Sequence, residues 1–330
     1  MKSLFANHGA PRTFLSLLRR EFWEHKGGLL WAPVVAGSLL LIMTMMALSV
    51  AQIGLGKSKV QMGALNLNQI TQNLTENQRA EVGAAIDIST LTTAGQIGIV
   101  VSIVVFFYCL GALYDERRDR SVLFWKSLPI SDRDTVLSKV LTALVVAPTI
   151  GILIGITTAL GVHLLLAVYL AFHGVNVFDL LLAAANPFKV FGYLLATIPL
   201  NIVWALPTVG WLLLCSAWAR SKPFLWAVAL PIGAGVLSSW FDVMRELSLP
   251  DTWFWTQIVA RLLGSIVPAS WIDFSTLERI DFRGPEDFMD WASLGNFYSV
   301  LAEPSAWIWA AAGVAMIVLS IRLRRWRDEG

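Results

Sequence analysis

The chain has 330 residues, a formal net charge of +2, 56% hydrophobic residues and only 15% charged residues. Soluble domains average about 25% charged residues, so too few charges are present here to cover a water-facing globule. The near balance of charge also argues against a nucleic acid as the main partner, because that needs a clustered basic face. The composition therefore indicates an integral membrane protein.

The first predicted element is an amphipathic helix over residues 11–26. Its apolar side holds Phe14, Leu15, Leu17, Leu18 and Phe22, and its polar side holds Arg12, Ser16, Arg19, Arg20 and Glu24. Glu21 and His25 intrude on the apolar side near its end. Such a helix lies along the inner membrane face before the chain turns upward, as an elbow. The alternative is an ordinary positively charged flank of the first span.

Six runs without Asp, Glu, Lys or Arg follow, and each is long enough for one membrane-spanning helix. We predict an all-α integral membrane protein in which residues 27–330 form a six-span domain. The spans are expected at about 28–51, 93–114, 140–170, 190–218, 223–241 and 304–321. The third run is too short for two spans and a turn, so it is predicted as one long, tilted helix that Pro148 and its neighbouring glycines could bend.

The start of the first run raises the question of a signal peptide. Ser49-Val50-Ala51 has the small residues of a cleavage site. The charged leader before the run is long, however, and the apolar run exceeds that of a signal peptide. We therefore predict a retained span.

The distribution of charge predicts the orientation. If both termini are cytoplasmic, 17 of the 25 basic residues lie inside and eight outside, whereas nine acidic residues lie inside and 14 outside. Cytoplasmic flanks of membrane spans carry an excess of Lys and Arg. We therefore predict a multi-pass protein of the cell inner membrane, surrounded by membrane lipid, with both termini in the cytoplasm.

Two segments are expected on the outer side. The first, 52–87, is rich in Asn, Gln and Thr, which is typical of a small exposed helical excursion or a mobile loop. The second, 242–303, interleaves ten acidic residues and four arginines with aromatic residues that suit the headgroup level of a bilayer. Within it, 256–272 is nearly apolar apart from Arg261, and its 17 residues favour a re-entrant or interfacial element over a seventh span.

The segment 115–139, expected on the inner side, is the densest in charge, with 11 charged residues out of 25. A mere connector between two spans needs only a few residues. Residues 119–128 could form a short helix that Pro129 ends, and 131–134 offer a cap for the third span. Apolar side chains within a ring of mixed charge suit a docking surface for another protein. The alternative is a solvated loop.

This segment resembles a known family. Tyr114-Asp115-Glu116-Arg117, Ser121-Val122-Leu123, the run from Lys126 to Ser131, and Lys139 are similar to the region between the second and third spans of ABC-2-type transporter permeases. In that family a Glu-Arg pair precedes a Gly-Thr or similar turn, and a short coupling helix ends at Pro-Val-Ser or Pro-Ile-Ser. The elbow helix, six spans and a membrane-dipping excursion before the last span are also similar. Asp119-Arg120-Ser121 departs from the Gly-Thr turn of many members, which leaves the subfamily open.

The resemblance implies a permease subunit of an ATP-driven exporter for a hydrophobic or amphipathic solute, such as a drug, lipid or peptide. Its partners would be a separate cytoplasmic ATPase and a second permease chain, in a homodimer or heterodimer. ATP and Mg²⁺ would bind that ATPase, and this chain would bind no cofactor or metal and perform no catalysis. The implied ATPase-coupling residues are Asp115, Glu116, Arg117, Arg118, Arg120, Phe124, Trp125, Lys126, Leu128 and Pro129; those of the elbow helix are Arg19, Arg20, Phe22 and Trp23. The alternative is a membrane anchor or sensory scaffold that does not transport.

Catalytic motifs give little support to an enzyme. Residues 51–58 match a relaxed phosphate-binding loop, but they follow a predicted membrane helix and lack the preceding strand, so chance explains them. His163 is the only ionisable residue of the third span, for which packing against a partner is favoured over a functional role. The spans contain no carboxylate, which disfavours proton-coupled transport. They also hold neither a nucleophile–base pair nor the paired Asp of an intramembrane hydrolase.

Overall fold

The computed structural model describes residues 10–62, 74–119, 130–175, 185–241, 243–247, 250, 252–273 and 277–327. Within these residues the chain is helical, contains no strand, and has six helical segments long and apolar enough to cross a membrane. These segments are Gly27–Ile53, Glu76–Arg118, Asp132–Phe172, Ile198–Trp218, Pro223–Trp240 and Pro304–Trp326. The prediction of an all-α chain with six candidate spans is confirmed.

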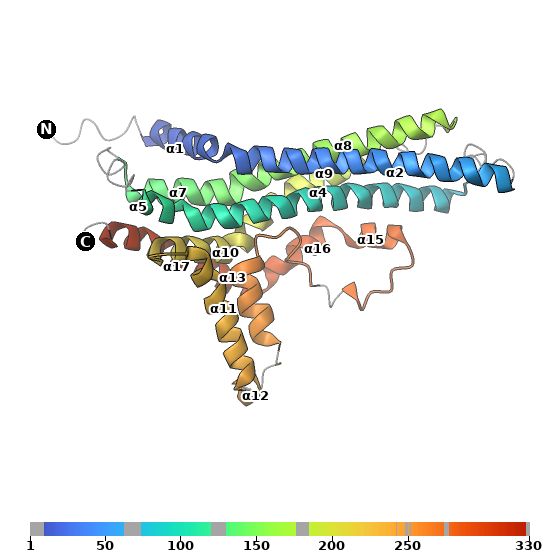
Figure 1. The fold of residues 1–330 in the computed structure, drawn as a ribbon. Coiled ribbons are helices and arrows are strands. Elements are labelled where there is room, and N and C mark those ends of the chain that lie inside the picture. The colour runs from blue at the N-terminus through green and yellow to red at the C-terminus, as the bar shows by residue number, and fades with distance from the viewer. Residues whose placement is uncertain are drawn as a thin grey trace.

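Three long helices lie side by side and form one layer of the molecule: α2 (Ala32–Met62), α4 (Glu76–Ala112) and α8 (Ala147–Phe172) (Figure 1). Next to α4 lies α10 (Ile198–Trp218), which packs in turn against α17 (Pro304–Arg327). The two ends of the described chain, α1 (Ala10–Glu24) and α17, both contact α7 (Asp132–Leu141). The two ends therefore lie at the same end of the molecule, as an even number of crossings requires.

The amphipathic helix predicted at the N-terminus is present as α1, but it is not separated from the first candidate span by a break. A π-helical turn, η1 (Gly27–Trp31), joins α1 to α2, and the residues flanking it, Lys26 and Ala32, have right-handed helical backbone. In Figure 1, α1 runs on toward α2 with only a shallow bend. A position of α1 along a membrane surface therefore stays a prediction.

The third candidate span is one helical segment, Asp132–Phe172, that begins eight residues earlier than expected. It consists of α7, a π-helical turn η2 (Thr142–Val146) and α8. Pro148 is the second residue of α8, after Ala147, and has no N–H to donate to a carbonyl of the preceding turn, so the helix widens there. Ser131 begins the segment, because its Oγ accepts a hydrogen bond from Asp134 N at 3.1 Å.

The fourth apolar run differs from the expected single helix. It is divided at Thr197 into α9 (Pro187–Ala196) and α10. Pro199 lies in the first turn of α10, where a missing N–H is tolerated but the helix cannot continue unbroken from α9. The candidate span is therefore the shorter Ile198–Trp218.

The helices α10 and α17 approach each other closely through two glycines. A Cβ added to Gly313 would lie 2.5 Å from the backbone carbonyl of Leu206, and one added to Gly210 would collide with the backbone of Gly313. Small residues allow the backbones of membrane helices to touch. These glycines therefore set the distance between α10 and α17.

The expected outer segment, 242–303, folds into short helices. α12 (Val243–Glu246) follows α11 (Pro223–Trp240), which leaves the layer of long helices at a steep angle (Figure 1). The chain then returns through η4 (Trp255–Val259), which contacts α11, and α13 (Ala260–Gly264). Further helices among the described residues of the segment are α15 (Pro285–Trp291), α16 (Leu294–Ser299) and the 3-10 turn η5 (Val300–Ala302).

Several aromatic residues of this segment pack together, and a position of the segment at the headgroup level of a bilayer stays a prediction. Trp271, Phe288, Trp291 and Phe297 pack into one cluster with Leu200 of α10. Helix α15 also packs against α4. Burying these rings together removes more apolar area from water than leaving each ring at an interface. The segment is thus a cover over one part of the helix layer.

Candidate functional site

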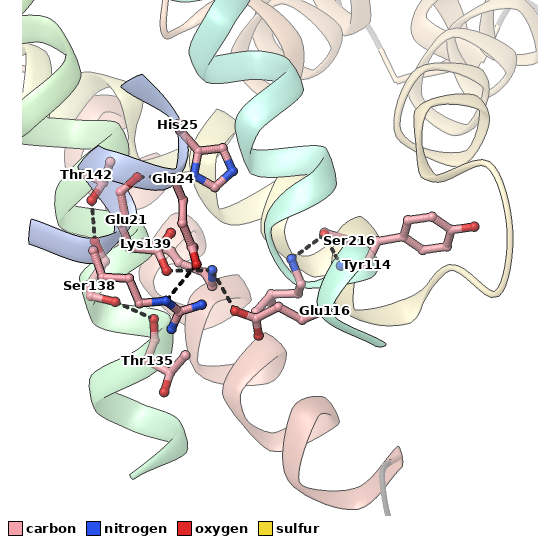
Figure 2. A network of polar contacts seen from close by, with 12 residues as sticks. Glu21, Glu24, His25, Tyr114, Glu116, Thr135, Ser138, Lys139, Thr142 and Ser216 are labelled. Atoms are coloured by element: carbon pink, nitrogen blue, oxygen red, sulfur yellow. Dashed lines mark hydrogen bonds and ion pairs between the residues drawn. The ribbon is translucent and has the colours of Figure 1, made fainter. Parts of the chain in front are cut away.

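The candidate site is a buried network of charged side chains where α1, α7, α17 and the short helix α5 (Tyr114–Arg118) meet. Its centre is Lys139 on α7, whose Nζ lies 2.9 Å from both Glu21 Oε1 and Glu116 Oε1 (Figure 2). The Lys139 side chain is only 2% exposed. Taking such an ion out of water costs several kcal/mol, so the two carboxylates are what make its burial tolerable.

Glu116 extends the network to the C-terminal helix. Its Oε2 lies 2.6 Å from Nη1 of Arg324 on α17, and Arg324 Nε lies 3.1 Å from Asp132 Oδ1 at the start of α7. We call these five residues, Glu21, Glu116, Asp132, Lys139 and Arg324, the ionic network. Three carboxylates and two cations leave one negative charge in excess. Asp132 is the most exposed member, so water can share that excess charge.

The second oxygen of Glu21 also has a partner. Tyr108, near the end of α4, donates its hydroxyl to Glu21 Oε2 at 2.9 Å. The His25 ring packs edge-on against the Tyr108 ring, with centroids 4.8 Å apart. A buried carboxylate with both oxygens engaged avoids most of the penalty of an unpaired charge. Glu21 and His25, which interrupted the apolar side of α1 in the sequence, are therefore contact residues for α4 and α7.

Hydroxyl groups beside Lys139 do not compete for its ammonium group. Ser138 and Thr142, its neighbours on α7 and η2, are fully buried and donate to backbone carbonyls of the preceding turn, Thr135 O and Ser138 O (Figure 2). Small side chains of this kind leave room for α1 to approach. The ion-pair partners of Lys139 within the described residues are consequently Glu21 and Glu116.

The start of the 115–139 segment is held to α10 by a separate set of hydrogen bonds. The backbone amides of Leu113 and Tyr114 both donate to Ser216 Oγ at 3.0 Å, and Ser216 Oγ donates to Leu110 O at 2.7 Å. The inserted hydroxyl interrupts the helical ladder between α4 and α5. Arg117 Nη2 also donates to the backbone carbonyls of Ser216 and Ala219. These carbonyls lie at the C-terminal end of α10, where the last turn of a helix has no following N–H groups to pair with them.

The predicted coupling residues fall into three groups. Glu116 and Arg117 are held within the protein by the contacts above. Asp115 and Arg118 are exposed on α5, and Arg118 Nε lies 3.5 Å from Asp119 Oδ1. The remaining ones lie outside the described residues: Arg120, Phe124, Trp125, Lys126, Leu128 and Pro129. The structure therefore bears only on the two ends of the 115–139 segment.

The predicted elbow residues divide in the same way. Phe22 packs against the main hydrophobic core, whereas Arg19 is exposed and Trp23 is 54% exposed. Arg20 forms an ion pair with Glu24 at 2.9 Å. Phe22 thus packs α1 against the protein, whereas the neighbouring side chains of Arg19 and Trp23 are exposed.

Three candidates for other chemistry have structural contacts of their own. Within the described part of the chain, ligand atoms of Glu21, Glu24 and His25 lie within 4.8 Å of one another, but both oxygens of Glu21 are used by Lys139 and Tyr108. Residues 51–58 are helical within α2, so their amides are not arranged as a phosphate-binding loop. His163 Nε2 lies 3.3 Å from Thr90 Oγ1 and 3.4 Å from Ser89 Oγ, which is a contact between helices.

The sequence did not single out several members of the site. Tyr108, Ser216 and Arg324 were ordinary residues of spans and flanks, and Asp132 was predicted only as part of a helix cap. The one available signal was Glu21, because a carboxylate on the apolar side of a helix must find a cation or be exposed. Which cation it finds depends on a contact between residues 118 positions apart.

Comparison of the chain with models of protein families, with curated proteins and with solved structures finds no match.

Proposed function

We propose that the chain is a membrane permease subunit that is driven by a separate ATPase, as in ABC exporters. The observation that carries the proposal is the position of Glu116. This residue lies at the entry to the 115–139 segment and joins it, through Lys139 and Arg324, to α1, α7 and α17. The same segment bears the resemblance to the coupling region of ABC-2-type permeases.

The ionic network suits a device that transmits force. Both described ends of the 115–139 segment, α5 and α7, carry members of the network, and α5 is also bonded to α10. Buried ion pairs are stiff because separating them exposes unpaired charges in a poorly solvated region. A push on the segment would therefore reach several long helices together and would not be absorbed by one flexible loop.

The proposal places ATP and Mg²⁺ on the partner ATPase. A second permease chain and membrane lipid would complete the assembly, and the transported solute would be hydrophobic or amphipathic. The proposed ATPase-facing side holds the exposed residues Arg19 and Trp23 of α1. It also holds the exposed residues Asp115 and Arg118 of α5. The inner membrane of a bacterial cell is the proposed location.

The test starts from the tagged chain purified with its native partners and reconstituted in liposomes. We expect a second polypeptide that is labelled by a photoreactive ATP analogue, hydrolyses ATP, and drives accumulation of an amphipathic fluorescent dye. The variant Glu116→Gln keeps the size of the side chain but removes its charge. It should retain the ATPase while lowering dye transport per ATP by about tenfold, the effect of roughly 1.4 kcal/mol.

The matched control is Glu81→Gln, the same substitution at an exposed carboxylate of α4 that belongs neither to the ionic network nor to the predicted coupling residues. It should transport as the unchanged chain does. Absence of any ATP-hydrolysing partner, or equal transport by both variants, would refute the proposal. A bound ATPase without ATP-driven transport would instead indicate a membrane anchor.

A further inference from the structure

A cavity of about 220 Å³ lies between α4, α8, α10 and the cover formed by the 242–303 segment. Val101 of α4, Ile152 of α8 and Ala205 of α10 are part of its walls, and Trp271 and Phe288 are part of its cover. No ionisable side chain of the described residues lines it. None of the residues that line the cavity belongs to the ionic network.

Glycines form part of the cavity wall. Gly95 of α4 lines the cavity, and a Cβ added there would meet no atom within 4 Å. Gly98, one turn later, has the opposite role, because an added Cβ would lie 2.5 Å from Pro268 Cγ. The cover thus rests closely on Gly98 while the space in front of Gly95 stays open.

Two polar groups at the cavity lack partners. The Asn201 carboxamide, which lines the cavity, makes no hydrogen bond within the part of the chain that the structure describes. The buried indole Nε1–H of Trp271 likewise has no acceptor there. By contrast, Ser102 donates to backbone carbonyls, at 2.8 Å from Ile266 O and 2.8 Å from Gly98 O. A buried polar group without a partner costs about 1–3 kcal/mol, which a ligand with a matching group recovers.

We propose that this cavity is a binding site for an uncharged small molecule, with an apolar body and one hydrogen-bonding group. The size supports this class, since an apolar cavity of roughly 150 Å³ in another protein holds benzene, and drug-sized ligands need about 300 Å³ or more. A charged ligand would be left unpaired among these walls. A plain lipid chain would leave the Asn201 carboxamide unsatisfied. Binding of such a molecule does not depend on an ATPase partner.

The test uses a phenol that carries a photoreactive diazirine, with 4-ethylphenol as competitor, on the full chain in liposomes. A phenolic hydroxyl both donates and accepts, so it can pair with the Asn201 carboxamide. We expect saturable labelling of α4 and of the cover, mapped by mass spectrometry and reduced by 4-ethylphenol. The change Asn201→Leu should weaken labelling by the phenol several-fold and leave labelling by the same diazirine without the hydroxyl unchanged.

The decisive variant is Gly95→Leu, which fills the cavity and should lower saturable labelling by about tenfold, equivalent to roughly 1.4 kcal/mol. Its matched control is Gly233→Leu on α11, where an added Cβ also meets no atom within 4 Å but no cavity is lined. The smaller change Gly95→Ala should give a partial loss and covers the case in which the leucine variant does not fold. Labelling that 4-ethylphenol does not reduce, or that persists unchanged in both Gly95 variants, would overturn the proposal and indicate occupation by lipid.

Discussion

Removing the positive charge of Lys139 is the sharpest test of the ionic network. In Lys139→Met, Glu21 keeps only the Tyr108 hydroxyl as a described side-chain partner, and Glu116 keeps Arg324. Breaking a buried ion pair by removing one partner costs about 3–5 kcal/mol, because the other charge stays buried without its counter-charge. We expect a loss of stability of that size, since Glu21 is only 1% exposed and water cannot replace the ammonium group.

The free energy of unfolding can be measured by denaturant titration of the detergent-solubilised protein. The control Lys222→Met makes the same substitution at an exposed lysine and should change stability by less than about 0.5 kcal/mol. In the double variant Glu21→Gln with Lys139→Met, the unpaired negative charge of Glu21 is also removed. Its cost should be smaller than the sum of the two single variants by about 1–3 kcal/mol. Additive costs, or a Lys139→Met variant as stable as Lys222→Met, would refute the reasoning.

Two further predictions concern the helix contacts around the network. Ser216→Ala removes the acceptor of two backbone amides and should lower the free energy of unfolding by about 1–3 kcal/mol. The control is Ser238→Ala, whose hydroxyl donates to Gly235 O within its own helix. It should lower the free energy of unfolding by less than about 1 kcal/mol in the same titration. Gly313→Ala places a methyl group against the backbone of α10 and should lower thermal stability, measured as the loss of monodisperse protein on heating. Gly233→Ala, which meets open space, is its control, and equal stability of the two glycine variants would contradict the close contact of α10 and α17.

Much of the secondary structure follows from the sequence, because a chain in hydrocarbon must pair its backbone groups locally. The six uncharged runs all became helices, and Pro148 marked the place of the π-helical turn in the third. The division of the fourth run at Thr197 was less visible. Pro199 is tolerated in the first turn of a helix, so its presence alone does not decide between a kink and a new start.

The site depended far more on tertiary structure. Glu21, Lys139, Glu116 and Arg324 were each readable as charges that flank a membrane span, and the sequence offered no rule for their pairing. Glu21 and Lys139 are 118 positions apart in the sequence, and Glu116 and Arg324 are 208 positions apart. The packing of α1, α5, α7 and α17 brings these pairs together. The sequence by itself determined that helices would form and that a carboxylate on an apolar face would need a cation. The tertiary structure decided which cation it meets and where a cavity stays open, because both depend on how helix surfaces fit together and not on any local pattern.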